Sequence, residues 1–149
     1  MILLRSVVYY IAMVITVAVY GITLATIGRF LSLTTNDNLA RQWGRVNLWL
    51  QQAICGLGYD IEGEERLPEG ACIVMSKHQS AWDTFALTLP FDDPALVMKA
   101  ELMKIPLYGW FSRKFGMIPI QRETGPGALR DMLKEARERA KAGRQILVF

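Results

Sequence analysis

The chain has 149 residues, enough for one domain of ordinary size, and 52% of them are hydrophobic. It carries 17 basic and 14 acidic side chains, but only one histidine and two cysteines, neither of them in a Cys-x-x-Cys pair. This composition excludes a disulfide framework and a cysteine–histidine zinc site, and it suits a reducing compartment.

The first predicted element is an uncharged run of 22 residues from Val7 to Gly28, flanked by Arg5 and Arg29. As a helix it would be roughly 33 Å long, close to the ~30 Å thickness of the hydrocarbon core of a bilayer. The apolar part of a cleaved signal peptide is shorter, about 7–15 residues. We therefore predict a retained membrane-anchoring helix. Its length leaves open whether it spans the bilayer or enters one leaflet.

A second helix is predicted over residues 37–57, with Asn36 or Asp37 as its N-cap. Apolar and aromatic residues recur on one face, and arginines and glutamines lie largely on the other. Tryptophan with arginine on such a helix is typical of the membrane interface, but the same pattern fits a helix that packs against a globular domain. Residues 1–58 are thus predicted to be membrane-associated helices that precede a globular domain at 59–149.

The globular part alternates between strand-like and helix-like segments, which predicts an α/β fold with a mostly parallel mixed sheet flanked by helices. Short apolar runs mark the expected strands, and longer periodic or capped segments mark the expected helices. The strands are predicted at 71–75, 95–98, 117–120 and 146–149, and the helices at 80–89, 101–115 and 126–142.

Three polar side chains follow predicted strands at the points where the strands end. His78 follows the first strand by three residues, Lys99 directly follows the second, and Arg122 follows the third by two. Because the carboxyl ends of parallel strands meet at one edge of the sheet, where ligands bind, we expect these side chains to converge there. The basic block at 99–122 holds five basic residues and one acidic residue, which fits phosphate groups or an anionic membrane.

His78 and Asp83 have two possible interpretations. If a helix begins near Ser80, Asp83 lies in its first turn and can reach back to the imidazole, fix its tautomer and stabilise the imidazolium. Such a pair can deprotonate a substrate hydroxyl. The same spacing also fits a capping box, in which Ser80 and Asp83 only begin the helix. The spacing alone leaves both interpretations open.

Two blocks of the sequence resemble the 1-acyl-sn-glycerol-3-phosphate acyltransferase family, the lysophospholipid acyltransferases. The first block is Ser-Lys-His-Gln-Ser-Ala-Trp-Asp at residues 76–83. The second begins Lys-Ala-Glu-Leu at residue 99 and ends Gly-Met-Ile-Pro-Ile-Gln-Arg at residue 122. The blocks follow a hydrophobic N-terminus in the family's order, and the resemblance covers about residues 60–149.

The resemblance implies transfer of an acyl chain from acyl-CoA or acyl carrier protein to lysophosphatidic acid, which gives phosphatidic acid. It implies that His78 is the general base, that Asp83 orients it, and that Lys99 and Arg122 hold the phosphate. No cofactor, metal or nucleic acid is implied. The implied partners are these substrates and membrane lipids, at the cytoplasmic side of a bacterial inner membrane.

The family's third block, Glu-Gly-Thr-Arg after a short strand, does not occur before the sequence stops at Phe149. We therefore expect a C-terminally truncated member, whose α/β domain is incomplete and whose phosphate site lacks one arginine. Two alternatives remain open. One is an acyltransferase for another lysolipid or for glycerol 3-phosphate, and the other is an inactive membrane-associated fragment.

Overall fold

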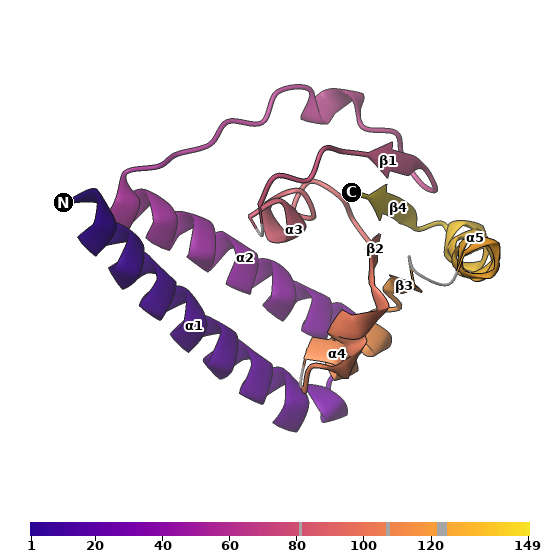
Figure 1. Ribbon diagram of the computed structural model, residues 1–149, viewed down its shortest axis with the longest axis horizontal. Helices are drawn as coiled ribbons and strands as arrows, with labels where there is room; N and C mark the ends of the chain where they lie inside the picture. The colour runs from indigo at the N-terminus through magenta and orange to yellow at the C-terminus, as the bar shows by residue number, and fades with distance from the viewer. Residues whose placement is uncertain (81, 107, 122–124) are drawn as a thin grey trace.

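The computed structural model describes residues 1–80, 82–106, 108–121 and 125–149. Two long helices form a hairpin at one end of the molecule, and a sheet covered by α5 lies at the other (Figure 1). The helices are α1 (Ile2–Thr26), α2 (Leu33–Cys55), α3 (Asp83–Ala86), α4 (Tyr108–Lys114) and α5 (Pro126–Lys141), and the strands are β1 (Ile73–Met75), β2 (Pro94–Lys99), β3 (Ile118–Ile120) and β4 (Gln145–Val148).

The four strands form one sheet in the order β1-β4-β2-β3, and all neighbouring pairs are parallel. Leu147 of β4 is in register with Val74 of β1 on one side and with Leu96 of β2 on the other. Parallel sheets that are covered on both faces need short apolar strands of this kind. The predicted α/β architecture is confirmed, and the last strand in the sequence lies between the first two.

Helices cover both faces of the sheet. On one face, Met132 and Ala136 of α5 pack against a buried cluster of strand residues that includes Val97 and Ile118. Met132 and Ala136 are one helical turn apart, so α5 presents a single apolar stripe to the strands. On the other face, α3 lies between the sheet and α2 (Figure 1), where Phe85 and its neighbour Ala86 pack with Leu48 and Trp43.

The turn between α1 and α2 is organised by Asn36, whose side chain is buried. Its amide group donates hydrogen bonds to the carbonyls of Gly28, Leu31 and Ser32, at 2.9, 3.3 and 2.9 Å. The Gly28 and Ser32 carbonyls also accept backbone amides, so the Asn36 side chain gives each of them a further donor and links three carbonyls of the connection that follows α1. Asn36 therefore fixes the angle at which the two helices meet.

Ser32 is the N-cap of α2, because its hydroxyl accepts a hydrogen bond from the Thr35 amide at 3.1 Å. The predicted helix over 37–57 exists, but the prediction that Asn36 or Asp37 caps it is wrong. A serine followed by two threonines already supplies the hydroxyl groups that begin the helix, so it starts four residues earlier than predicted.

A buried polar contact fixes the alignment of the hairpin. The side chain of Asn47 on α2 is buried and accepts a hydrogen bond from the Thr16 hydroxyl on α1 at 3.2 Å. Thr16 in turn accepts one from the Trp43 indole at 3.3 Å. Buried polar pairs of this kind are satisfied in only one alignment of two helices, so they oppose sliding of α1 along α2.

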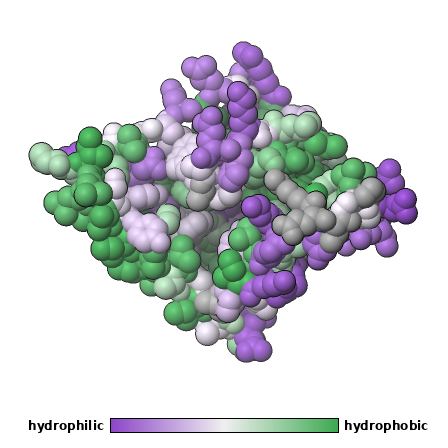
Figure 2. Space-filling model, in the orientation of Figure 1, coloured by the Kyte–Doolittle hydropathy of each residue, from purple (hydrophilic) through white to green (hydrophobic). Residues whose placement is uncertain are grey.

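The outer surface of α1 is apolar and exposed along its length. Most of its large apolar residues are exposed, and the space-filling view shows apolar surface along the lower left, where α1 lies (Figure 2). Among the described residues, α1 is the one helix whose length and composition would allow it to cross a membrane. The predicted hydrophobic helix is therefore present.

The end of the hairpin that holds the turn between α1 and α2 is attached to the α/β domain by two cationic side chains. The Lys114 ammonium group donates to the Gly28 carbonyl at 2.5 Å. Arg41 of α2 donates to the carbonyls of Leu89 and Asp92, which lie between α3 and β2. Of the two roles left open for the second helix, packing against the domain is therefore seen directly.

Two predicted helices are shorter than expected. The segment 80–89 is helical only in α3, and 101–115 divides into a 3₁₀ turn at Ala100–Lys104 and α4, because Pro106 interrupts the backbone hydrogen bonds. Gly109 allows α4 to approach this turn closely, since a Cβ at residue 109 would overlap the carbonyl group of Met103. Gly116 has φ of 62° and serves the turn before β3.

Candidate active site

His78 and Asp83 meet in the loop between β1 and α3, at the carboxyl edge of the sheet. His78 Nδ1 lies 3.3 Å from Asp83 Oδ2, and the His78 side chain is 46% exposed whereas that of Asp83 is 13% exposed. An ionised carboxylate can only accept hydrogen bonds, so the imidazole proton belongs on Nδ1. The other ring nitrogen, Nε2, is then left to accept a proton from a bound molecule.

The same carboxylate oxygen also organises the loop backbone. Asp83 Oδ2 accepts hydrogen bonds from the amides of Gln79 and Ser80, at 2.6 and 2.9 Å. These amides, that of Ser80 first, hold the pKa of the Asp83 carboxyl below its usual range, and nearby His78 lowers the pKa further. The Ser80 hydroxyl accepts the Trp82 amide at 3.2 Å, but the N-cap of α3 is Trp82, which makes no side-chain cap hydrogen bond. Only one half of the predicted capping box is therefore present, the bond from the Ser80 amide to Asp83, and the same carboxylate also contacts the imidazole.

Phe149 is a site residue that the sequence did not reveal. Its ring lies against the imidazole of His78, with ring centroids 5.2 Å apart and planes inclined by 36°. The contact follows from the strand order, because β4 lies beside β1 and Phe149 directly follows β4. No spacing in the sequence brings residues 78 and 149 together, so only the pairing of the strands could have shown it.

Lys99 lies at the same edge of the sheet as His78, but not beside it. It is the last residue of β2, it is exposed, and β4 separates β2 from β1. Two strand spacings of about 4.8 Å place the two strand ends roughly 10 Å apart. Arg122 lies outside the described residues, although the end of β3 before it is beside the end of β2.

The two tryptophans near these motifs, Trp82 and Trp110, make ring contacts with neighbouring side chains. Trp82 meets Tyr59 edge to face at a centroid distance of 5.9 Å. The Lys114 ammonium group lies 5.0 Å from the centre of the Trp110 ring. The first contact attaches the end of the His78 loop to the segment before β1, and the second lies within α4.

An apolar groove of about 420 Å³ runs between the hairpin and α4. Leu24 of α1, Trp43 of α2 and Phe111 of α4 are among its walls. A smaller cavity of about 160 Å³ shares Trp43, Tyr108 and Phe111 with the groove and extends to Met98 on β2. Met98 directly precedes Lys99, so apolar space extends from the outer face of the hairpin towards the carboxyl edge of the sheet.

The described residues contain no group of three or more histidine, cysteine or acidic side chains arranged to hold a metal ion. Cys55 and Cys72 are both free thiols. The described residues at this edge include the imidazole–carboxylate pair, and Lys99 lies on the same edge.

Comparison with known proteins identifies related sequences. The acyltransferase family profile matches residues 58–149. A 1-acyl-sn-glycerol-3-phosphate acyltransferase of Pseudomonas aeruginosa is 32% identical over 147 residues, which is 98% of this chain and 57% of that protein. The chain thus spans little more than half the length of this curated relative. No solved structure matches it.

Proposed function

The chain belongs to the acyltransferase family, and from this we propose that it transfers an acyl group from a thioester to the free hydroxyl of lysophosphatidic acid. The observation that carries the proposal is the His78–Asp83 pair, with Nδ1 3.3 Å from Oδ2 and the carboxylate fixed by two backbone amides. The identity of the acceptor is supported by the Pseudomonas relative, which bears that name. The donor is acyl-CoA or acyl carrier protein.

In the proposed reaction, His78 Nε2 accepts the proton of the acceptor hydroxyl as its oxygen attacks the thioester carbonyl. Asp83 stabilises the resulting imidazolium through Nδ1. The tetrahedral intermediate then expels the thiolate, and the imidazolium returns the proton to it, so the products are an ester and a free thiol. His78 is half exposed, which leaves Nε2 accessible, and no covalent enzyme intermediate is needed.

Lys99 and Arg122 are proposed to hold the phosphate of the acceptor. Lys99 supports this role through its place at the end of β2, exposed and on the same sheet edge as His78. A separation of roughly 10 Å between the strand ends suits a substrate whose reacting hydroxyl and phosphate lie apart on a glycerol backbone. An ammonium group contributes a point charge, and a guanidinium group adds a planar fork of donors for phosphate oxygens.

Acyl transfer by the whole chain is tested with a panel of acceptors. Membranes containing the protein are supplied with radiolabelled acyl-CoA and with lysophosphatidic acid, glycerol 3-phosphate or lysophosphatidylcholine. We expect labelled phosphatidic acid to be the main product, formed at least tenfold faster than the product from the other acceptors. Faster transfer to glycerol 3-phosphate or to the other lysolipid would favour the alternative of an acyltransferase with that acceptor. If the membranes form no more labelled product than control membranes that lack the protein, the result would favour a non-catalytic membrane-associated fragment.

We also propose that the hairpin holds the domain at the cytoplasmic side of a membrane, with α1 lying within one leaflet. Both ends of α1 are attached to its neighbours, through Cys55 to the Arg5 carbonyl at 3.8 Å and through Lys114 to the Gly28 carbonyl. A spanning α1 would therefore draw α2 into the hydrocarbon core, including exposed Arg45, at a cost of about 2.5–3.5 kcal/mol for that side chain alone.

The membrane arrangement is tested by labelling single cysteines in a chain with Cys55→Ser and Cys72→Ser. One cysteine is placed in a short tag before Met1, and the other replaces Asn38 in α2, just past the hairpin turn. With α1 in one leaflet, a membrane-impermeant maleimide should label both sites from the cytoplasmic side only. Labelling of the tag from the opposite side, with residue 38 still cytoplasmic, would show that α1 spans the bilayer.

A further inference from the structure

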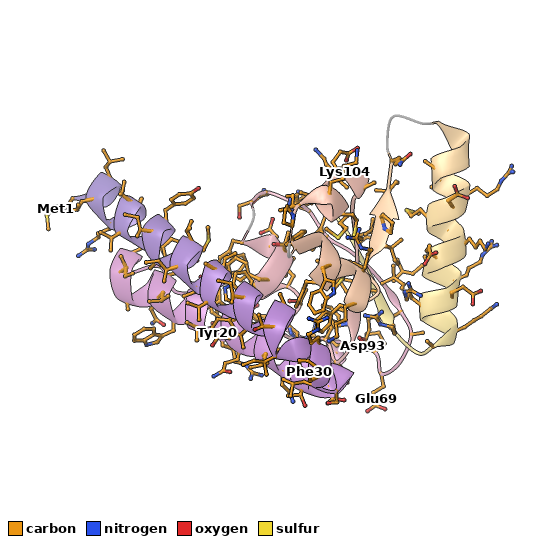
Figure 3. All side chains as sticks on the ribbon, turned by 90° about the horizontal axis from the view of Figure 1, so that it is seen from below. Met1, Tyr20, Phe30, Glu69, Asp93 and Lys104 are labelled. Atoms are coloured by element: carbon orange, nitrogen blue, oxygen red, sulfur yellow. The ribbon has the colours of Figure 1, made fainter. Side chains whose placement is uncertain are left out.

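The outer face of α5 carries a row of four basic side chains. Arg130, Lys134, Arg137 and Lys141 are spaced by four, three and four residues, which places them on one face of the helix. All four are exposed, and Figure 3 shows nitrogen-tipped side chains of α5 pointing away from the rest of the molecule. We call these four residues the α5 basic stripe.

Ion pairs within α5 neutralise the stripe only at its far end. Glu135 pairs with Arg139, which lies outside the stripe, at 3.1 Å. Glu138 pairs with Lys141 at 3.2 Å. With the other described residues, Arg130, Lys134 and Arg137 form no ion pair, and they face solvent. Asp131 and Glu138 are also exposed on α5, next to Arg130 and Arg137. The helix nevertheless carries five basic and three acidic side chains, so it keeps a net positive charge.

The position of the stripe favours a soluble partner over a membrane. The helix α5 lies at the opposite end of the molecule from the α1–α2 hairpin, beyond the sheet (Figures 1 and 3). Its outer face therefore points away from the apolar surface of α1, the surface suited to lipid. A bilayer that accepts α1 does not reach the stripe, so a partner for the stripe has to approach from the aqueous side.

The beginning of α5 connects the stripe to the active site. This helix follows β3, and the carboxyl ends of β3, β2 and β1 share the edge that carries Lys99 and the His78 loop. Arg130, in the second turn of α5, is the member of the stripe closest along the chain to that edge. An acyl thioester on a flexible arm could therefore extend from a protein seated on the stripe to the imidazole.

We propose that the α5 basic stripe docks an acidic acyl carrier protein, which presents the acyl thioester to His78. This inference rests on the proposed acyl transfer and names its donor. Complementary charge on a carrier's acidic surface supplies the attraction, raises the association rate and makes both sensitive to salt. No covalent step beyond the proposed transfer is involved.

Direct binding tests the stripe without requiring catalysis. Fluorescently labelled holo acyl carrier protein is titrated with the detergent-solubilised chain, and anisotropy is followed in 50 and 300 mM salt. Arg130→Glu/Arg137→Glu should weaken binding at least tenfold in low salt and flatten its salt dependence. Arg66→Glu is the control for a single Arg137→Glu, because it reverses the same charge at a site outside the stripe. Arg66 is 85% exposed and lies in the 3₁₀ turn before β1. Equal binding by the double variant and the native chain would overturn the proposal.

Two further measurements separate the other outcomes. The rate with the carrier thioester, divided by the rate with acyl-CoA, should fall at least tenfold in the double variant. An unchanged ratio with native binding constants counts against the stripe, whereas no transfer from either donor contradicts the proposed function and leaves the binding result standing. Flotation with vesicles of phosphatidylglycerol is the last measurement. If the double variant loses vesicle binding but keeps carrier binding, the stripe contacts membranes and the proposal is wrong.

Discussion

Replacing His78 by alanine is expected to lower the rate of acyl transfer by about 10²- to 10⁴-fold, the usual contribution of a positioned general base. The variant loses the imidazole that contacts Asp83 and whose Nε2 is proposed to take up the hydroxyl proton. The measurement is the initial rate with lysophosphatidic acid and labelled acyl-CoA at fixed protein concentration. The effect should fall on kcat more than on KM, because the imidazole acts on the reacting proton and not on the phosphate or the acyl chain.

His78→Ala is compared with Lys77→Ala, which removes the exposed neighbouring side chain. Circular dichroism and thermal unfolding should show both variants folded as the native chain is, because His78 is half exposed and lies in a loop outside the buried clusters. Equal transfer by native protein and His78→Ala would remove His78 from the mechanism. An equal loss in Lys77→Ala would point to a disturbed loop instead.

Replacing Asp83 by alanine is expected to have an effect at least as large as that of His78→Ala, and for two reasons. The imidazolium loses its carboxylate, and the amides of Gln79 and Ser80 lose their acceptor. Asparagine separates these losses, because its single carbonyl oxygen can take the place of Oδ2, where the three donors converge. Asp83→Asn should therefore keep the loop and lose only charge, worth about 1.5–3 kcal/mol, or roughly 10- to 150-fold in rate.

The lowered pKa of Asp83 also predicts how the loop responds to acid. A carboxyl whose pKa is depressed by folding stabilises the folded loop at pH values above its ordinary pKa of 3.8, and this stabilisation is lost as the pH falls through the lower folded value. Slow hydrogen exchange of the Gln79 and Ser80 amides, relative to the intrinsic rate at each pH, should therefore persist from pH 7 down to the ordinary pKa of 3.8, and be lost only as the pH falls through the lower folded value. Asp83→Asn should show no such acid transition. Loss of protection near pH 6 in the native chain would contradict this account of Asp83.

Because the chain has one histidine, the imidazole can be followed by NMR without assignment ambiguity. The nitrogen shifts of His78 should report a proton on Nδ1 in the native chain and in Asp83→Asn, since both offer an acceptor oxygen to that atom. Mixed tautomers in Asp83→Ala, where the acceptor is gone, would support the orienting role independently of any rate.

Local patterns predicted the strands and the longest helices well. The four apolar runs became β1 to β4 within one or two residues, and the helix predicted at 126–142 became α5 at Pro126–Lys141. Each is determined by its own residues, through apolar runs, Pro126 at the first turn and Gly143 after the end. The start of α2 was missed because Ser32, Asn36 and Asp37 can all cap a helix, and only the three-dimensional turn decides among them.

Strand order determines the part of the site that the sequence could not predict. His78 and Asp83 were found from their own segment, because both the hydrogen bonds and the imidazole contact of Asp83 lie within five residues. The sequence predicted that His78 and Lys99 converge at one edge of the sheet. They share that edge, but β4 lies between β1 and β2 and keeps them apart. The contact of Phe149 with His78 could not be predicted either, because it depends on β4 lying beside β1.

The placement of β4 also has a consequence for the newly made protein. During synthesis, β1 emerges early, but its partner β4 follows only after more than sixty further residues, so β1 waits unpaired until the last strand is made. Closing so long a loop is slow and comes late in folding. The loop that carries His78 directly follows β1, so pairing of β4 with β1 fixes the base of this loop and brings Phe149 against the imidazole. A nascent chain in which β4 has not yet been made therefore lacks the contact between Phe149 and His78, and pairing of β4 with β1 creates it.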